Sequence, residues 1–116
     1  MDKLFFEQSK SIKIYLATET QLDPFEKNVS RSYLNPLPIK AIITDLVASQ
    51  INWKMPGIIA DKAKEIIIKK KYRNLIERSQ KIEVNDELYE GWRLNGKMQI
   101  REEGNYLRIY IYMKHV

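Results

Sequence analysis

The last third of this 116-residue chain contains two successive β-hairpins, and this feature most constrains the fold. Asn85-Asp86 and Asn95-Gly96 tolerate the positive φ angles that two-residue hairpin turns require. The runs flanking these turns alternate in polarity and are rich in Ile, Val, Tyr and Trp, which suits a half-buried pleated sheet. We expect strands at residues 81–84, 87–94, 97–101 and 106–114, with a turn at 102–105. This part of the chain therefore predicts an antiparallel meander.

The first half of the chain adds further strands. Residues 11–17 place Ile12, Ile14 and Leu16 on one face, which predicts a strand. Residues 18–28 are polar and predict a loop, and residues 29–34 suit a short strand before the prolines at 36 and 38. The apolar run 39–47 predicts a strand in the centre of the sheet, because both of its faces are largely apolar. Residues 1–11 are predicted as an arm or a first short turn of helix.

Two segments in the middle are harder to assign. Residues 48–59 are predicted as a long loop, since Pro56-Gly57 marks a turn. Residues 61–80 fit a helix by composition and spacing, and a strand by their β-branched run. We assign a strand over 65–72 and a turn or short helical piece over 74–79. The resulting fold class is mainly β: a small antiparallel β-barrel or meander with long loops and at most one short helix. It is expected as one domain (1–116), with an arm (1–11) and a barrel (12–114).

The chain has little equipment for catalysis or metal binding. It has no cysteine, and its one histidine, His115, is next to last, so no zinc site or Ser-His-Asp triad can be assembled. The four glycines are not clustered, which excludes a phosphate-binding glycine loop. Glu102-Glu103 and Asp86-Glu87 fall at predicted hairpin tips, where burial cannot tune a carboxyl pKa. We therefore expect no enzymatic activity, no metal site and no cofactor.

The positive charge is concentrated in one window. Between Asp61 and Lys81 there are eight basic and three acidic residues, so the net charge of +5 comes entirely from this window. Such a field attracts nucleic acid, an acidic protein surface or an anionic membrane, whereas the plainer interpretation is a solvated face that protects a strand edge. The candidate basic segment consists of Lys69, Lys70, Lys71 and Arg73.

The last predicted strand has one aromatic face. By the two-residue period of a strand, this face holds Tyr106, Arg108, Tyr110 and Tyr112. The opposite face is aliphatic and is predicted to be buried: Leu107, Ile109 and Ile111. Aromatic rings beside an arginine can stack single-stranded bases. The other interpretations are a second packed face of a barrel wall or a contact between subunits.

The predicted loop 48–59 carries large apolar side chains beside turn-forming residues. Exposed Trp and Met side chains indicate a binding partner, because such surface is unfavourable in water. The candidate partner loop consists of Gln50, Trp53, Lys54 and Met55. The alternative is that Trp53 closes one end of the core.

Three stretches carry a family resemblance: IYLATET at 14–20, IIIKKKYRNLIERSQKIEVNDELYEGWRLNGK at 66–97, and YLRIYIY at 106–112. In order and layout, residues 12–114 resemble the head-closure (head–tail joining) proteins of tailed bacteriophages. In that family a basic-aromatic strand such as Lys71-Tyr72-Arg73 precedes a hairpin with a tyrosine in its second strand, such as Glu87-Leu88-Tyr89. The chain departs from this layout at residues 90–95, where polar residues replace an apolar continuation, and this leaves the strand register open there.

The resemblance implies a virion structural protein. Members of the family are β-barrel subunits of an oligomeric ring, which closes the DNA-filled head at the head–tail connector and docks the tail. The resemblance also implies a long loop that extends into the channel, and residues 48–59 are the candidate for it by position. The implied partners are copies of itself, portal or adaptor proteins and tail proteins, with packaged DNA in the channel as a further candidate and no membrane. The implied location is the virion, assembled in the bacterial host cytoplasm. The alternative function is a small basic β-barrel nucleic-acid-binding module.

Overall fold

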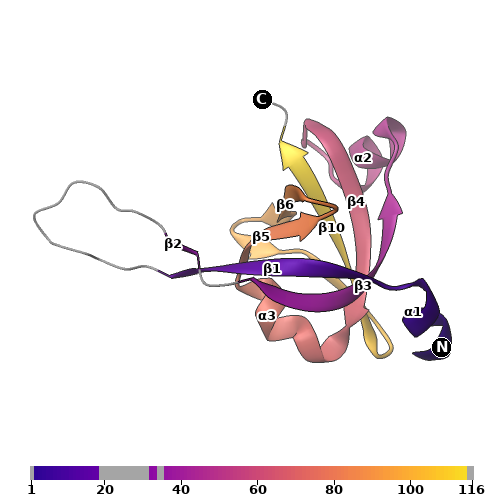
Figure 1. Cartoon of the computed structure of the whole chain (residues 1–116). Coiled ribbons are helices and arrows are strands. Elements are labelled where there is room, and N and C mark those ends of the chain that lie inside the picture. The colour runs from indigo at the N-terminus through magenta and orange to yellow at the C-terminus, as the bar shows by residue number, and fades with distance from the viewer. Residues whose placement is uncertain (1, 19–31, 34–35, 115–116) are drawn as a thin grey trace, which may run out of the picture.

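Six antiparallel strands close into a barrel at the centre of the computed structural model (Figure 1). The structure describes residues 2–18, 32–33 and 36–114. The barrel strands are β1 (Lys10–Thr18), β3 (Leu37–Asp45), β4 (Ala60–Lys69), β5 (Ser79–Val84), β6 (Glu87–Gly91) and β10 (Tyr106–Lys114). The additional strands are β2 (Ser32–Tyr33), β7 (Arg93–Leu94), β8 (Lys97–Met98) and β9 (Ile100–Glu103). The helices are α1 (Asp2–Gln8), α2 (Ala48–Lys54), α3 (Arg73–Glu77) and the 3-10 helix η1 (Lys70–Tyr72).

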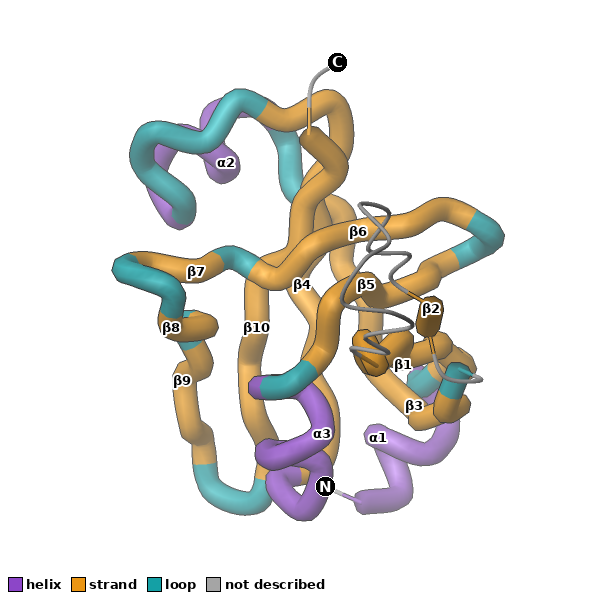
Figure 2. Tube along the Cα trace, turned by 90° about the vertical axis from the view of Figure 1, so that its left-hand side faces the viewer, coloured by secondary structure: helices purple, strands orange, loops and turns teal. Residues whose placement is uncertain are grey.

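The barrel closes because β1 has a partner strand on each edge. It pairs with β3 through Ile12 and Ile39, and with β5 through Ile14 and Ile82. The other neighbours are β3–β4, β4–β10, β10–β6 and β6–β5, all antiparallel. In this cyclic order β4 and β10 form one wall, and β5 and β1 form the wall across the barrel (Figure 2).

Strand β10 organises the C-terminal half of the fold. One of its edges pairs with β4 along almost its whole length, from Tyr106–Lys69 to Tyr112–Ala63. The other edge is shared, since β9 pairs with its first half and β6 with Ile111 and Tyr112. Between these two pairings the chain leaves the barrel as the small β7–β8 hairpin.

This excursion interrupts two of the predicted strands. The predicted strand 87–94 breaks at Trp92, and the predicted strand 97–101 breaks at Gln99. The backbone N–H groups of both residues remain satisfied: Trp92 donates to the Tyr110 carbonyl at 2.9 Å, and Gln99 donates to the Trp92 carbonyl at 3.0 Å. The breaks arise because a single edge of β10 serves both β6 and β9, so the connecting chain must turn outward.

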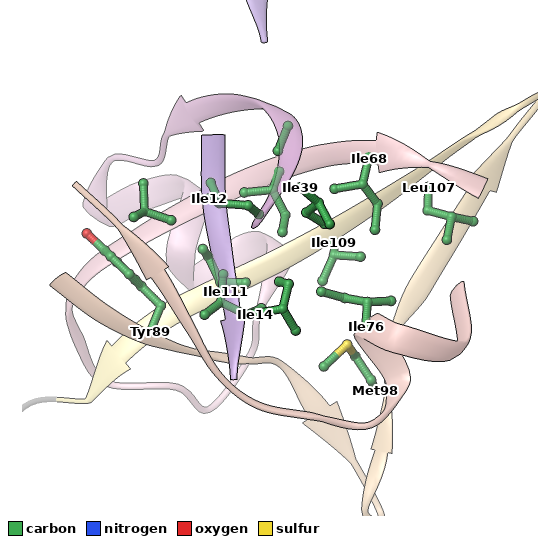
Figure 3. Close-up of a cluster of buried hydrophobic side chains, with 14 residues drawn as sticks. Ile12, Ile14, Ile39, Ile68, Ile76, Tyr89, Met98, Leu107, Ile109 and Ile111 are labelled. Carbon is green, nitrogen blue, oxygen red and sulfur yellow. The ribbon is translucent and has the colours of Figure 1, made fainter. Parts of the chain in front are cut away.

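The core fills the barrel with aliphatic side chains from nearly every barrel strand (Figure 3). On β10 the predicted alternation is confirmed, since Leu107, Ile109 and Ile111 are fully buried. Tyr89 from β6 and Ile76 from α3 are also fully buried in this cluster. A core of this size accounts for a stable domain that contains neither disulfide nor thiol.

The predicted hairpin turns are confirmed. Asn85 and Asp86 have φ angles of 52° and 64°, and Asn95 and Gly96 have φ angles of 54° and 77°. Two consecutive residues with positive φ match the twist of the flanking antiparallel strands. Gly104, in the turn between β9 and β10, also has a positive φ of 60°.

The predicted loop 48–59 is wrong over its first half, because residues Ala48–Lys54 form α2. Ile51 and Met55 lie one helical turn apart and are both buried in a second cluster with Tyr112. The backbone N–H of Val47 donates to the Gln50 side chain at 3.0 Å, which satisfies one donor at the start of the helix. Packing against distant residues thus makes a helix of a segment with no strong helical pattern of its own.

The segment 61–80 divides into strand and helix at a different point from the prediction. Strand β4 begins at Ala60 and ends at Lys69, and residues Lys70–Tyr72 form η1 instead of continuing the strand to 72. The strand ends there because its partner β10 begins at Tyr106, directly opposite Lys69. The predicted short helical piece is α3, which begins and ends slightly earlier than expected, and Ser79 already belongs to β5.

The N-terminal predictions have mixed outcomes. The strand at 11–17 is confirmed as β1, and the arm contains the helix α1. The described chain has three short α-helices where at most one was expected, because each is fixed by packing on the barrel. Part of the expected strand 29–34 is present as β2, while the predicted loop 18–28 lies almost entirely outside the described residues.

Candidate functional site

The outer face of the β4–β10 wall is hollowed beside α2. We call this hollow, about 570 Å³ in volume, the α2 groove. Helix α2 forms one side of it, and β9 and β10 form the other. The groove is lined by Ser49, Gln50, Trp53, Lys54, Arg101 and Tyr110.

A continuous series of ion pairs crosses this wall, and we call it the charge chain: Lys54, Glu65, Arg108, Glu103 and Arg101. Lys54 Nζ lies 3.2 Å from Glu65 Oε2, and the other oxygen of Glu65 lies 3.5 Å from Arg108 Nε. Arg108 Nη2 lies 3.0 Å from Glu103 Oε2, whose second oxygen lies 3.3 Å from Arg101 Nε. Each carboxylate therefore bridges two cations, one through each oxygen.

The middle of the charge chain is its most buried part. Glu65 is buried, and an ionised carboxylate in such a place is tolerated only with cationic partners. Lys54 and Arg108 supply them, and Lys54 Nζ also lies 5.3 Å from the centre of the Tyr110 ring. Because Lys54 is on α2, this pairing helps to hold the helix on the barrel wall.

The α1 end of the same wall is more apolar. Phe5 packs on Tyr106 with ring centres 5.2 Å apart. A smaller hollow of about 210 Å³ lies between α1 and the sheet, and Ile42, Ile67 and Arg108 contribute to its lining. The outer wall thus runs from an apolar hollow under α1, across the charge chain, to the α2 groove.

The aromatic face predicted on the last strand is largely covered by the chain's own helices. Tyr106 is buried beside Phe5 of α1, and Tyr112 is buried in the cluster formed with α2. Arg108 and Tyr110 remain half-buried between the two helices. The packed-wall interpretation therefore accounts for this face better than a base-stacking platform, which needs open rings.

The four residues of the predicted partner loop separate into different environments. Met55 is fully buried, whereas Trp53 is 69% exposed and presents its indole to solvent beside the groove. Gln50 caps the start of α2, and Lys54 begins the charge chain. Trp53 is exposed and does not close the core, whereas Met55 is buried and is not available to a partner. A partner for Trp53 stays a prediction.

The predicted basic segment is partly neutralised. Lys70 and Arg73 both pair with Glu102, and Arg73 also lies 3.2 Å from Glu77. The hydrogen bond from Lys70 lowers the pKa of the Glu102 carboxyl. Lys69 and Lys71 stand over the aromatic rings of Phe5 and Tyr72, and neither has a carboxylate partner among the described residues.

The wall across the barrel has a different character. On β1 and β5, Glu83 lies 3.4 Å from Lys13 and accepts a hydrogen bond of 3.1 Å from the Tyr15 hydroxyl. Desolvation and the neighbouring Glu83 raise the pKa of Tyr15. Next to the β5–β6 turn, Leu88 on β6 is 49% exposed.

Several sites are absent from the described part of the chain. No group of three or more His, Cys, Asp or Glu residues could hold a metal ion there. No helix in the same residues is long and apolar enough to cross a membrane. Comparisons with protein-family models, curated proteins and solved structures give no match for this chain.

Sequence reasoning missed Glu65, Glu103, Arg101 and Ser49 as members of this site. Their places follow from strand register, which the sequence does not show. Glu65 pairs with Tyr110, so the two side chains lie on the same face of the sheet. Arg101 and Glu103 reach this face through the pairing of β9 with β10. The position of α2 beside them depends on tertiary packing.

Proposed function

We propose that this chain is a virion structural protein that forms an oligomeric ring at the head–tail connector of a tailed bacteriophage, closing the DNA-filled head and docking the tail. The proposal takes its functional content from the family resemblance of residues 12–114. The structural observation that supports it is the presence of two unlike surfaces on opposite walls of one closed barrel.

A ring of identical subunits requires such a pair of surfaces. In a ring with more than two members, each subunit contacts its neighbours through two different patches that fit one another. The β4–β10 side offers exposed Trp53, a groove and the cations at the ends of the charge chain. The β1–β5–β6 side offers the polar cluster of Lys13, Tyr15 and Glu83, and exposed Leu88.

The basic segment fits the same proposal in a secondary role. Lys69 and Lys71 retain positive charge that no described carboxylate balances, at one end of the barrel. Such charge suits either packaged DNA or an acidic surface of an adjacent ring.

The test is the mass of the purified protein in solution, combined with negative-stain electron microscopy. The protein is measured alone and after co-expression with the proteins encoded beside it in its genome. We expect annular particles whose mass is a multiple of the 13.8 kDa chain. A chain that stays monomeric in both conditions contradicts the proposal.

The same experiment evaluates the alternative function, a small basic nucleic-acid-binding module. Short single- and double-stranded DNA is added at several salt concentrations. A nucleic-acid module binds with an affinity that falls steeply with salt, since each neutralised phosphate releases counterions. Tight, salt-sensitive binding by a monomer would favour this alternative, and the change Lys69→Gln with Lys71→Gln should then abolish it.

A further inference from the structure

The α2 groove carries a positive charge that the chain itself does not balance. The charge chain alternates in sign and contains three cations and two carboxylates, so it has one cation in excess. Its two ends are the cations Lys54 and Arg101, and both ends line the same groove. A carboxylate placed between these two side chains would pair with both cations and close the series into a ring of alternating charges.

The aromatic side chains of the groove indicate what kind of residue would lie next to that carboxylate. Trp53 and Tyr110 line it, and the indole of Trp53 is mostly exposed. Exposed aromatic surface next to a cation is the composition of an interface centre, where a tryptophan or arginine supplies much of the binding energy. The occupant that fits is therefore a carboxylate with a neighbouring apolar side chain.

The chain itself contains such an element on its other side. Among the side chains that the structure describes, Glu7 and Asp86 are the carboxylates with no hydrogen bond or ion pair. Asp86 lies at the tip of the β5–β6 hairpin, and half-exposed Leu88 follows it. This tip and α2 lie on opposite sides of the molecule (Figure 2).

The positions of Glu7 and Asp86 show which of these two carboxylates can enter the groove of a neighbouring copy in a ring. Glu7 is on α1, which packs on the same β4–β10 wall as the groove, so a contact through it would join like faces. Asp86 projects from the far side, so a contact through it joins unlike faces and can repeat around a ring.

We propose that the α2 groove receives the tip of the β5–β6 hairpin from a second copy of this chain. In this contact Asp86 of one copy lies between Lys54 and Arg101 of the next, and Leu88 packs against Trp53. The inference rests on the proposed function and names the contact that would repeat around the ring.

Neutralising substitutions test the contact. Asp86→Asn keeps a residue that tolerates positive φ but removes the charge, and Arg101→Gln removes the charge on the other side. We expect each to weaken self-association, measured by sedimentation equilibrium, at least about tenfold, and the double variant to be little weaker than either single variant. Glu7→Gln is the matched control and should associate like the unaltered chain. Unchanged association of Asp86→Asn, or equal weakening by Glu7→Gln, would overturn the inference.

Cross-linking covers the case in which the isolated chain associates too weakly to be weighed. Because the chain has no cysteine, Ser49→Cys in the groove and Leu88→Cys near the hairpin tip introduce the only thiols. With a short bismaleimide at high protein concentration, the variant carrying both should give a ladder of covalent oligomers. The control pair Ser49→Cys with Glu7→Cys should give no ladder.

The outcomes separate this inference from the proposed function. Rings that form as well with Asp86→Asn as without it overturn the groove–hairpin contact and leave the ring proposal standing. A chain that forms no ring, alone or with its neighbours, overturns the proposed function. In that case the cross-linking ladder still decides the contact: its presence supports the groove–hairpin pairing, and its absence refutes it.

Discussion

Met55 is the residue through which α2 is anchored to the barrel, and its truncation measures how firmly that helix is held. Its side chain is fully buried between Leu46, Ile51 and Tyr112. Met55→Ala removes the three non-hydrogen atoms beyond Cβ, a lost transfer free energy of about 2 kcal/mol. The remaining cavity adds to this, which places the expected loss of unfolding free energy at about 2–4 kcal/mol.

The position of the second cluster favours the lower part of this range. Leu46 and Ile51 are buried but keep 9% and 8% of their surface exposed, and a helix of only seven residues can move inward to fill part of the space. We therefore expect about 2–3 kcal/mol, a large share of the roughly 5–15 kcal/mol that stabilises a domain of this size. The midpoint of thermal unfolding should fall by roughly 10 °C.

The assay is urea unfolding followed in parallel by circular dichroism and tryptophan fluorescence. Trp53→Ala is the matched control on the same helix, because its side chain is mostly exposed and its loss should change the unfolding free energy by less than about 0.5 kcal/mol. A loss below about 1 kcal/mol for Met55→Ala would refute the docking of α2 on the barrel. Equal losses for both variants would show that the helix has the wrong face toward the core.

Three further predictions concern the barrel, one of its turns and the response to pH. Ile109→Ala in the main core should cost about 2–5 kcal/mol by urea unfolding, and a cost below about 1 kcal/mol would mean that the register of β10 is wrong. Gly96→Ala should cost about 1 kcal/mol, because an alanine is strained at a φ of 77°, while no atom lies close enough to clash with its Cβ; no loss of thermal stability would contradict a left-handed turn there. Hydrogen bonds from Lys64 and Lys70 lower the pKa values of Asp45 and Glu102 in the folded protein, so their stabilising contribution is present above the ordinary carboxyl pKa. This contribution is lost as the pH falls through the folded-state pKa values. Between neutral and acidic pH, the midpoint of thermal unfolding should therefore fall less in Asp45→Asn and Glu102→Gln than in the unaltered chain. Variants whose midpoints follow the same pH dependence as the unaltered chain would refute the pairing.

The amino-acid sequence by itself determined the features that depend on neighbours along the chain. Asn85-Asp86 and Asn95-Gly96 fixed two hairpin turns, because few residues adopt positive φ at low cost. The two-residue alternation in β10 identified Leu107, Ile109 and Ile111 as core without knowledge of any partner strand. The two-residue period of a strand and the residue preferences of turns are local properties, so the sequence alone predicts them.

The tertiary structure alone decided the features that depend on residues far apart. Helix α2 exists because Ile51 and Met55 meet Ala63 and Tyr112, which lie on strands that follow later in the chain. The end of β4 depends on where β10 begins, and the predicted strands break at Trp92 and Gln99 because β10 has only one free edge to share. A helix of seven residues is too short to be stable alone, so α2 gains its stability from packing.

The candidate site divides in the same way. Trp53 and Lys54 could be singled out from the sequence, because large apolar side chains there stand beside the turn-forming Pro56-Gly57. Their joining to Glu65, Arg108 and Arg101 in one charge chain required the register of four elements. Electrostatic pairing acts over a few ångströms in space regardless of separation along the chain, so only the folded barrel shows which charges are balanced and which remain available to another molecule.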